Sequence, residues 1–139
     1  MPATPASQIA NTAKSFFVAA SHLLNYPQES PLPVLFLLAR SIELALKSIL
    51  IRGGTQPQVL SRKPFGHDLV ALVTEVQRLQ LVDPNTLTTL DISALELLNR
   101  EYISTKLGYP ELGRTYMLPR LDLVDEATKK LVNLARHDD

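Results

Sequence analysis

The stretch PVLFLLARSIELALKSILIRGG, residues 33–54, decides the fold. Of the 18 residues from 34 to 51, 13 are apolar, and charges interrupt the run at spacings of three and four. At 100° per residue, Arg40, Glu43 and Lys47 fall within about 60° of one another on a helix. The stretch is therefore predicted to form one helix with a broad apolar face and a single charged stripe.

The apolar arc of this helix is wide enough to contact several neighbours, which predicts the central helix of a bundle. Its predicted core face consists of Leu35, Leu38, Ala39, Ile42, Ala45, Leu46, Ile49 and Leu50. We expect the charged stripe on the opposite face, with Phe36, Leu44 and Ile51 between its members. Gly53 and Gly54 mark the end of the helix, since glycine commonly follows the last helical turn.

Helical spacing of apolar residues recurs along the rest of the chain. It predicts further helices over about 5–25, 67–82, 83–106 and from 121 onward. The third of these has two start signals: Asp83 followed by proline, and a capping box at Ser93 and Glu96. This segment is therefore either one helix or two that meet near Asp91.

No segment alternates between apolar and polar residues with a period of two, so the predicted fold class is all-α. We expect an up-and-down bundle of about five helices in a single domain over residues 1–139, with residues 1–5 as a flexible N-terminus. The segment 53–66 contains glycine and proline among polar residues, and it is predicted to be a mobile loop.

The amino-acid composition limits which ligands and which kinds of active site the chain is expected to have. The 14 Lys and Arg balance the 14 Asp and Glu, and a net charge of zero is not typical of a dedicated duplex-binding protein. The absence of cysteine excludes disulfides and thiolate chemistry. The three histidines are scattered and no glycine-rich phosphate loop occurs, so no metal and no cofactor are predicted.

The apolar run 34–51 does not predict a membrane span, because each charge at the bilayer centre would cost roughly 2.5–3.5 kcal/mol. The N-terminal residues lack the basic and apolar regions of a signal peptide. We therefore expect a cytoplasmic protein without a membrane partner.

The pair Glu43 and Lys47, together with the segment Phe65-Gly66-His67-Asp68-Leu69, is the sharpest polar feature. Apolar residues flank Glu43, and a partly buried carboxylate needs hydrogen-bond partners. His67, at the start of the next predicted helix, is positioned to supply one. Two interpretations remain open: a structural tie between two helices, or a ligand-binding or catalytic site.

These same residues resemble the HEPN domains (higher eukaryotes and prokaryotes nucleotide-binding). Members often carry a helix ending in Glu-x-x-x-Lys-x-x-Leu, followed by a Gly-His-Asp-Leu helix start, and a Tyr-x-x-x-Arg-Tyr-Pro motif before the last helix. Here Tyr102, Tyr109 and Pro110 match the last motif, while Gly108 stands where Arg is usual. The resemblance covers residues 6–136.

The resemblance implies an all-α bundle, frequent homodimers, and roles in nucleotide binding, RNA cleavage, toxin–antitoxin systems or defence. It also implies a nucleotidyltransferase or an antitoxin as a protein partner. Together with the charged stripe, the resemblance gives seven ligand-binding candidates: Arg40, Glu43, Lys47, His67, Asp68, Tyr102 and Tyr109.

The ribonuclease branch of the family uses an Arg followed four to six residues later by a His, late in the bundle. Arg62 and His67 match this spacing but precede the third long helix, so no catalytic residue is carried over. We therefore expect a non-catalytic module that binds a nucleotide, an RNA or a protein partner. The alternatives are a metal-independent ribonuclease, with His67 as base and Arg40 or Arg62 stabilising the phosphate, and a structural dimeric scaffold.

A homodimer is also predicted from apolar residues left outside the expected core, because a monomer exposes few contiguous apolar groups. These are Phe36, Leu44, Ile51, Tyr109, Leu112, Tyr116, Met117 and Leu118. The alternative is that the segment 109–118 folds over the central helix and covers both sets within one chain.

Overall fold

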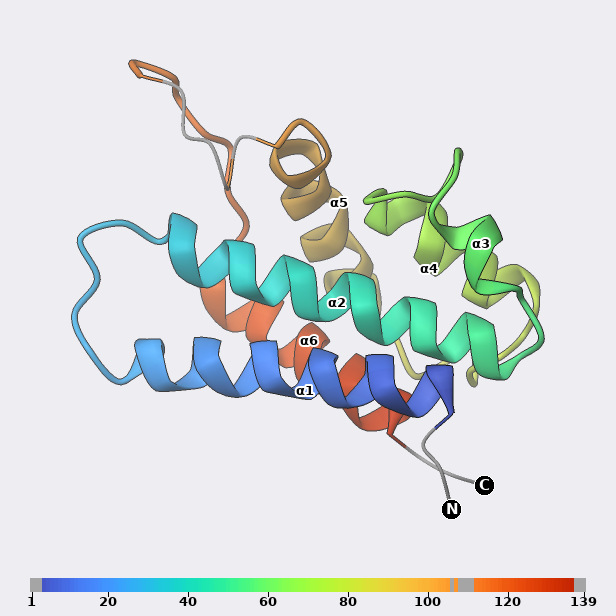
Figure 1. Ribbon diagram of the computed structural model, residues 1–139. Helices are drawn as coiled ribbons and strands as arrows, with labels where there is room; N and C mark the ends of the chain where they lie inside the picture. Colours follow the sequence, from blue (N-terminus) through green and yellow to red (C-terminus); the bar gives the residue numbers. More distant parts are fainter. Residues whose placement is uncertain (1–3, 106, 108–111, 137–139) are drawn as a thin grey trace.

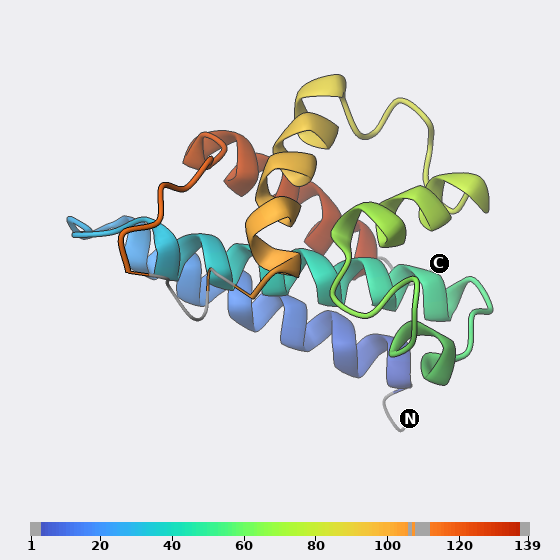
Figure 2. The same cartoon turned by 90° about the horizontal axis from the view of Figure 1, so that it is seen from above.

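The computed structural model describes residues 4–105, 107 and 112–136. Within these residues the chain forms six α-helices and no strand, which confirms the predicted all-α class. The helices are α1 (Pro5–Leu24), α2 (Leu32–Arg52), α3 (Pro57–Leu60), α4 (Leu69–Arg78), α5 (Thr89–Ile103) and α6 (Leu121–Ala135). In Figure 1, α2 runs through the middle of the molecule, with α1 along one side, α4 and α5 along the other, and α6 behind α1 and α2. Figure 2 shows the same arrangement from above.

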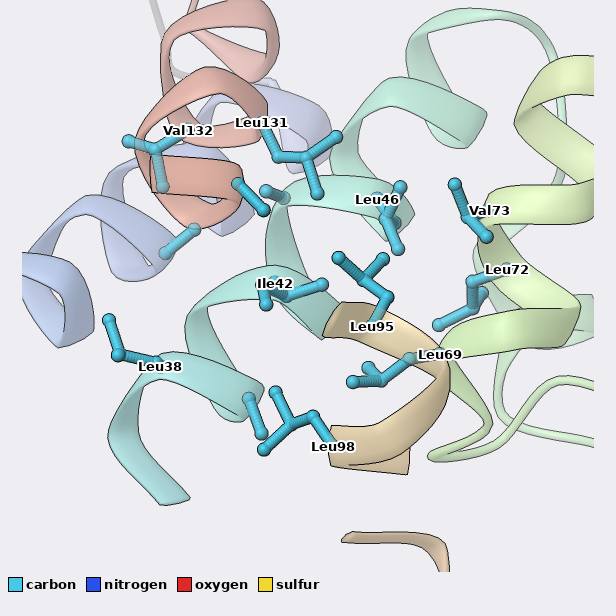
Figure 3. Close-up of a cluster of buried hydrophobic side chains, with 14 of the residues drawn as sticks. Leu38, Ile42, Leu46, Leu69, Leu72, Val73, Leu95, Leu98, Leu131 and Val132 are labelled. Atoms are coloured by element: carbon cyan, nitrogen blue, oxygen red, sulfur yellow. The ribbon is translucent and has the colours of Figure 1, made fainter. Parts of the chain in front are cut away.

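The central position of α2 follows from its apolar sequence. It contacts each of the other five described helices, and twelve of its 21 residues are buried, more than in any other helix. Figure 3 shows Leu38, Ile42 and Leu46 of α2 converging with leucines and valines of α4, α5 and α6. Each fully buried leucine stabilises the fold by roughly 1.5–3 kcal/mol relative to an exposed one. These contacts confirm the prediction that this stretch forms the central helix of the bundle.

Helix α1 lies antiparallel to α2 and packs against it through small residues (Figure 1). The Ser41 hydroxyl donates to the carbonyl of Ala13, and the Ser48 hydroxyl donates to the carbonyl of Ala6, each at 2.7 Å. All four residues are buried. Small side chains let the two helix backbones approach closely, and each buried hydroxyl has a backbone carbonyl of α1 as its hydrogen-bond acceptor.

The glycine pair ends α2 as predicted. Gly54 has a φ of +110°, and its N–H donates to Ile51 while the N–H of Thr55 donates to Leu50. This pattern satisfies carbonyls in the last helical turn and needs a residue without Cβ at Gly54. A Cβ on the preceding Gly53 would lie 2.7 Å from a methyl carbon of Leu81, so the end of α2 packs directly against the segment that follows α4.

The segment 53–66 is more structured than predicted. Pro57 starts the one-turn helix α3, and Leu60 at its end is 2 % exposed and belongs to the hydrophobic core. Proline at the first position of a helix loses no hydrogen bond, and one buried leucine fixes the turn against α2. The predicted loop therefore contains one short helix, which its glycines, prolines and polar residues did not indicate.

The start of α5 also differs from the prediction. Thr88 caps the helix, with its hydroxyl accepting from the N–H of Asp91 and the Asp91 carboxylate accepting from the N–H of Thr88. Asp83 instead accepts from the N–H of Asn85 in a turn. Ser93 and Glu96, the other predicted start, lie inside α5. Helix α1 begins at Pro5, as predicted, with Thr4 as its N-cap.

The apolar residues assigned to a dimer surface are partly covered within the chain. Phe36, Leu44, Ile51 and Leu118 are half-buried against the core, whereas Leu112 and Met117 are exposed. The segment after 112 is held to α5 by an ion pair of 2.6 Å between Arg114 and Glu101. Of the two remaining members, Tyr116 is half-buried and Tyr109 lies outside the described residues. None of the helices in the described part of the chain combines the length and apolar character that a membrane crossing requires.

Candidate functional site

A buried carboxylate on α2 is the centre of the polar site. Glu43 is 1 % exposed and lies where α5 and the segment before α4 pack against α2. The prediction that the charged stripe faces away from the core was therefore wrong at this residue. The reason is that α2 is surrounded on several sides, so the face opposite α1 is also covered.

Four side chains donate hydrogen bonds to this carboxylate, two to each oxygen. Oε1 accepts from the Tyr102 hydroxyl at 2.5 Å and from Nδ1 of His67 at 2.9 Å. Oε2 accepts from Nζ of Lys47 at 2.8 Å and from Nη1 of Arg40 at 3.0 Å. A carboxylate offers about four acceptor positions, so Glu43 is fully satisfied. We call these five residues the Glu43 cluster.

The electrostatics of the cluster fix its protonation. Burial by itself would raise the pKa of the Glu43 carboxyl, but its hydrogen bonds, led by the one from Lys47, outweigh burial and hold the pKa below its usual value. Burial and the neighbouring carboxylate raise the pKa of the Tyr102 hydroxyl, which therefore stays protonated and donates. Burial would lower the pKa of Arg40, but the charge of Glu43 offsets it and the pKa is raised.

The tautomer of His67 follows from this protonation. An ionised carboxylate can only accept hydrogen bonds, so Nδ1 of His67 carries the proton. In the neutral ring the lone pair then resides on Nε2. The side chain is 63 % exposed, and Nε2 has no hydrogen-bond partner in the part of the chain that the structure describes. Glu43 thus orients a histidine whose basic nitrogen is open to solvent.

Asp68 and Asn99 hold the backbone beside His67. The Asp68 carboxylate caps α4 by accepting from the N–H of Ala71 at 3.0 Å, and it also accepts from the Asn99 amide at 2.9 Å. The side-chain oxygen of Asn99 accepts from the N–H of Leu69 at 2.8 Å. Asn99 lies three residues before Tyr102 on α5, so one face of α5 positions both the start of α4 and the carboxylate of Glu43.

Aromatic rings surround the outer side of the cluster. The Tyr102 ring makes an edge contact with Phe36, with centroids 6.2 Å apart, and another with His67, with centroids 6.1 Å apart. Edge contacts of this kind are favourable arrangements of aromatic groups. They connect the half-buried Phe36 of α2 to the exposed His67 ring.

The structure thus brings together five of the seven predicted ligand-binding residues, and confirms the hydrogen bond predicted between Glu43 and His67. Asp68 lies next to them in a capping role, and Tyr109 lies outside the described residues. Arg62, the other half of the Arg–His spacing, donates to the carbonyl of Gln58. The sequence analysis did not predict that Asn99 and Phe36 belong to the site. The three-residue spacing between Asn99 and Tyr102 places both on one face of a helix, and it could have indicated Asn99.

The charges of the cluster do not cancel. Two cations, Arg40 and Lys47, face one carboxylate, which leaves one formal positive charge in excess with His67 neutral. Lys47 is 15 % exposed, whereas Arg40 is 34 % exposed and reaches the surface. Because Glu43 is buried, a ligand would meet His67 and Arg40 first. The cluster therefore suits an anionic ligand.

Comparison of the chain with protein-family models, with curated proteins and with solved structures finds no match in any of the three.

Proposed function

We propose that this chain is an HEPN-like module that binds a nucleotide or a single-stranded RNA at the surface of the Glu43 cluster, without chemistry of its own. The observation that carries the proposal is the pairing of an exposed imidazole with a partly exposed guanidinium on one buried carboxylate. The motif resemblance to the HEPN domains supports the same ligand class.

The cations support contact with phosphate. Arg40 keeps its charge at any ordinary pH, and guanidinium groups bind phosphate oxygens through charge-assisted hydrogen bonds. Its Nη1 is engaged by Glu43, which fixes the direction of the side chain. A cation held in place loses less conformational entropy when it binds a ligand than a mobile one does.

The aromatic groups support contact with a base. Single-stranded nucleic acids stack their bases on aromatic side chains, histidine included, and each stacked base contributes roughly 1–3 kcal/mol. The exposed His67 ring is held by Glu43 on one side and by Tyr102 on the other. This arrangement favours an unpaired base over a duplex, in agreement with the balanced overall charge.

Fluorescence anisotropy with a labelled oligoribonucleotide and competition by mononucleotides tests the proposal. Arg40→Ala should weaken binding about tenfold, the usual effect of losing one charge-assisted contact. It should also reduce the salt slope of binding by about 0.7, as expected for one phosphate contact on a single strand. The matched control is Arg120→Ala, since Arg120 is a surface arginine that pairs with Asp122. Equal effects of the two substitutions, or no binding by the wild type, would contradict the proposal.

A metal-independent ribonuclease is the second candidate, and the tautomer of His67 favours it. A histidine whose Nδ1–H is bonded to a carboxylate keeps a basic Nε2, which can remove the proton of an RNA 2′-hydroxyl. Arg40 would then stabilise the negative charge that develops on the phosphate. Incubation with RNA in the presence of a chelator tests this candidate: cleavage to 2′,3′-cyclic phosphate ends, lost in His67→Ala and kept in His22→Ala, would support it. If the RNA stays intact, the ribonuclease candidate is excluded and the binding module remains the proposed function.

The HEPN resemblance also leads us to propose a homodimer and a nucleotidyltransferase or antitoxin as protein partner. Support for the homodimer comes from the exposed Leu112 and Met117.

A further inference from the structure

We propose that His67 is a phosphoryl acceptor, a site of covalent phosphorylation at Nε2 by donors that carry the phosphoryl group on nitrogen. This inference concerns the same surface as the binding proposal but does not depend on it, because the acceptor chemistry follows from His67 and Glu43 alone.

The first requirement for such a site is a nucleophilic nitrogen. A neutral imidazole attacks through its unprotonated nitrogen, and the partner of the other nitrogen decides which one that is. Nδ1 of His67 is committed to Glu43 at 2.9 Å, and this carboxylate is held ionised by its other partners. The lone pair is therefore kept on Nε2, and attack through Nδ1 would require the Glu43 bond to break.

The second requirement is access. The His67 side chain is 63 % exposed, and its position just before the N-cap of α4 places it on a short turn. In that turn the N–H of Asp68 donates to the carbonyl of Phe65 at 2.7 Å. Asn99 and the helix cap at Asp68 hold the backbone, so a donor meets a ring that is already oriented.

The third requirement is stabilisation of charge. As the lone pair of Nε2 forms the bond to phosphorus, the ring becomes positively charged, and the buried carboxylate bonded to Nδ1–H stabilises that charge. Arg40 and Lys47 keep this carboxylate ionised and add a net positive charge near the incoming phosphoryl oxygens. The same cluster therefore supports both the nucleophile and the transferred group.

The transfer balances with a phosphoramidate as donor. The Nε2 lone pair forms the new N–P bond, and the P–N bond of the donor breaks. The donor reacts in its N-protonated form, so its nitrogen already carries three hydrogens and leaves as ammonia with the electron pair of that bond. The Nδ1 proton stays in the hydrogen bond to Glu43, and the product ring carries the positive charge that the donor nitrogen has lost. No oxidation or reduction takes place.

The chain contains its own comparison, His22 in the last turn of α1. Its side chain is exposed and makes no hydrogen bond or ion pair with any residue that the structure describes. His22 therefore reports how fast an ordinary exposed histidine of this protein reacts with the same donor.

The test is to incubate the full chain with phosphoramidate, follow labelling by intact mass, and map the modified histidine by peptide analysis with ³¹P NMR of the product. We expect His67 to be modified at Nε2 roughly tenfold faster than His22, the effect of one oriented, charge-stabilised nucleophile. Equal rates at the two histidines, modification of His67 at Nδ1, or no reaction at His67 would overturn the proposal.

A variant of Glu43 tests whether the reactivity of His67 comes from its bond to this carboxylate or only from its exposure to solvent. Glu43→Gln, with its fold checked by circular dichroism, removes the charge that stabilises the phosphorylated ring, and should lower the rate at His67 toward that at His22. An unchanged rate in a folded Glu43→Gln protein would overturn the role given to Glu43. If this variant does not fold, the comparison of His67 with His22 in the wild type decides the proposal. If His67 is not labelled but the protein binds RNA, the acceptor proposal fails and the proposed function stands. If His67 is labelled but the protein does not bind RNA, the proposed function fails and the acceptor site stands.

Discussion

The hydroxyl of Tyr102 on α5 donates to Oε1 of Glu43 on α2 at 2.5 Å, across 59 residues of sequence. Both side chains are buried, so this bond joins two helices in the interior of the molecule. Its acceptor is charged, which makes it stronger than a bond between neutral groups.

Tyr102→Phe should therefore destabilise the protein by about 1.5–3 kcal/mol, the usual contribution of a hydrogen bond to a charged group. Urea denaturation followed by circular dichroism measures the change. Tyr26→Phe serves as the control, because Tyr26 is 68 % exposed and should lose almost no stability. Equal stability of the Tyr102→Phe variant and the wild type would show that the bond contributes nothing.

Removal of the carboxylate itself should have a larger effect. Glu43→Ala leaves Lys47, which is 15 % exposed, with no acidic partner among the residues that the structure describes, and breaking a buried charge pair costs about 3–5 kcal/mol. Glu75→Ala provides the control: it removes a carboxylate that pairs with the exposed Arg78, and should cost less than about 1 kcal/mol. Similar losses in the two variants, measured by denaturant unfolding, would count against a central role for the Glu43 cluster.

The depressed pKa of Glu43 makes this stabilisation dependent on pH. Because the carboxyl binds its proton more readily in the unfolded chain, its contribution is complete above the ordinary value of 4.5 and is lost as the pH falls toward the folded pKa. Wild-type stability should therefore decrease below this pH, and Glu43→Gln should show a shallower decrease. Asp91, whose pKa is also depressed despite its burial, should account for part of the slope that remains. Parallel acid denaturation curves would contradict the assignment.

A gain in stability is expected at the end of α4. Gln80 has a φ of +54°, and its N–H and that of Leu81 make the same terminal hydrogen bonds as those after α2. Since glycine adopts positive φ without strain, Gln80→Gly should stabilise the protein by about 0.5 kcal/mol. Gly54→Ala, the opposite change at a φ of +110°, should destabilise it by about 1 kcal/mol. Thermal unfolding of both variants measures these changes, and the same sign for both would contradict the backbone argument.

The homodimer prediction can be decided by sedimentation at micromolar concentration. A dimer would have twice the mass of the 15.4 kDa chain and should bury more than about 1,000 Å². Met117→Asp and Leu112→Asp should then shift the equilibrium toward the monomer. A single 15.4 kDa species, unchanged on dilution, would rule the homodimer out.

Local signals in the sequence predicted much of the fold and the centre of the site. The apolar arc of the segment 33–54 and its two glycines gave the most buried helix and its end. Glu43 and His67 could be paired because a carboxylate among apolar residues requires a donor, and the next helix start offered one. Tyr102 entered through the motif resemblance, and the structure adds the hydrogen bond that connects it to the same carboxylate.

Contacts between distant segments decided the features that were mispredicted. Asp83 and Thr88 both carry cap-like signals, but Lys130 on α6 pairs with Asp91 at 2.6 Å and so stabilises the helix start at Thr88. The burial of Leu60 likewise fixes α3, which no local pattern indicated. Glu43 is buried because α5 covers a second side of α2. The periodicity of apolar residues indicates one buried face of a helix more clearly than two, so the burial of Glu43 was not predicted.

The two serine hydroxyls between α1 and α2 have a consequence for how the chain finds its packing. Ser41 and Ser48 are seven residues apart, as are their acceptors Ala13 and Ala6, so the two bonds form a matched pair along antiparallel helices. A slide of α1 by one turn, about 5.4 Å, would bring Phe17 opposite Ser41 in one direction, or move Ser48 beyond the start of α1 at Pro5 in the other. In either case one hydroxyl would be kept away from a carbonyl of α1, and a buried hydroxyl without a partner costs about 1–3 kcal/mol. The two serines therefore favour a single registration of α1 against α2.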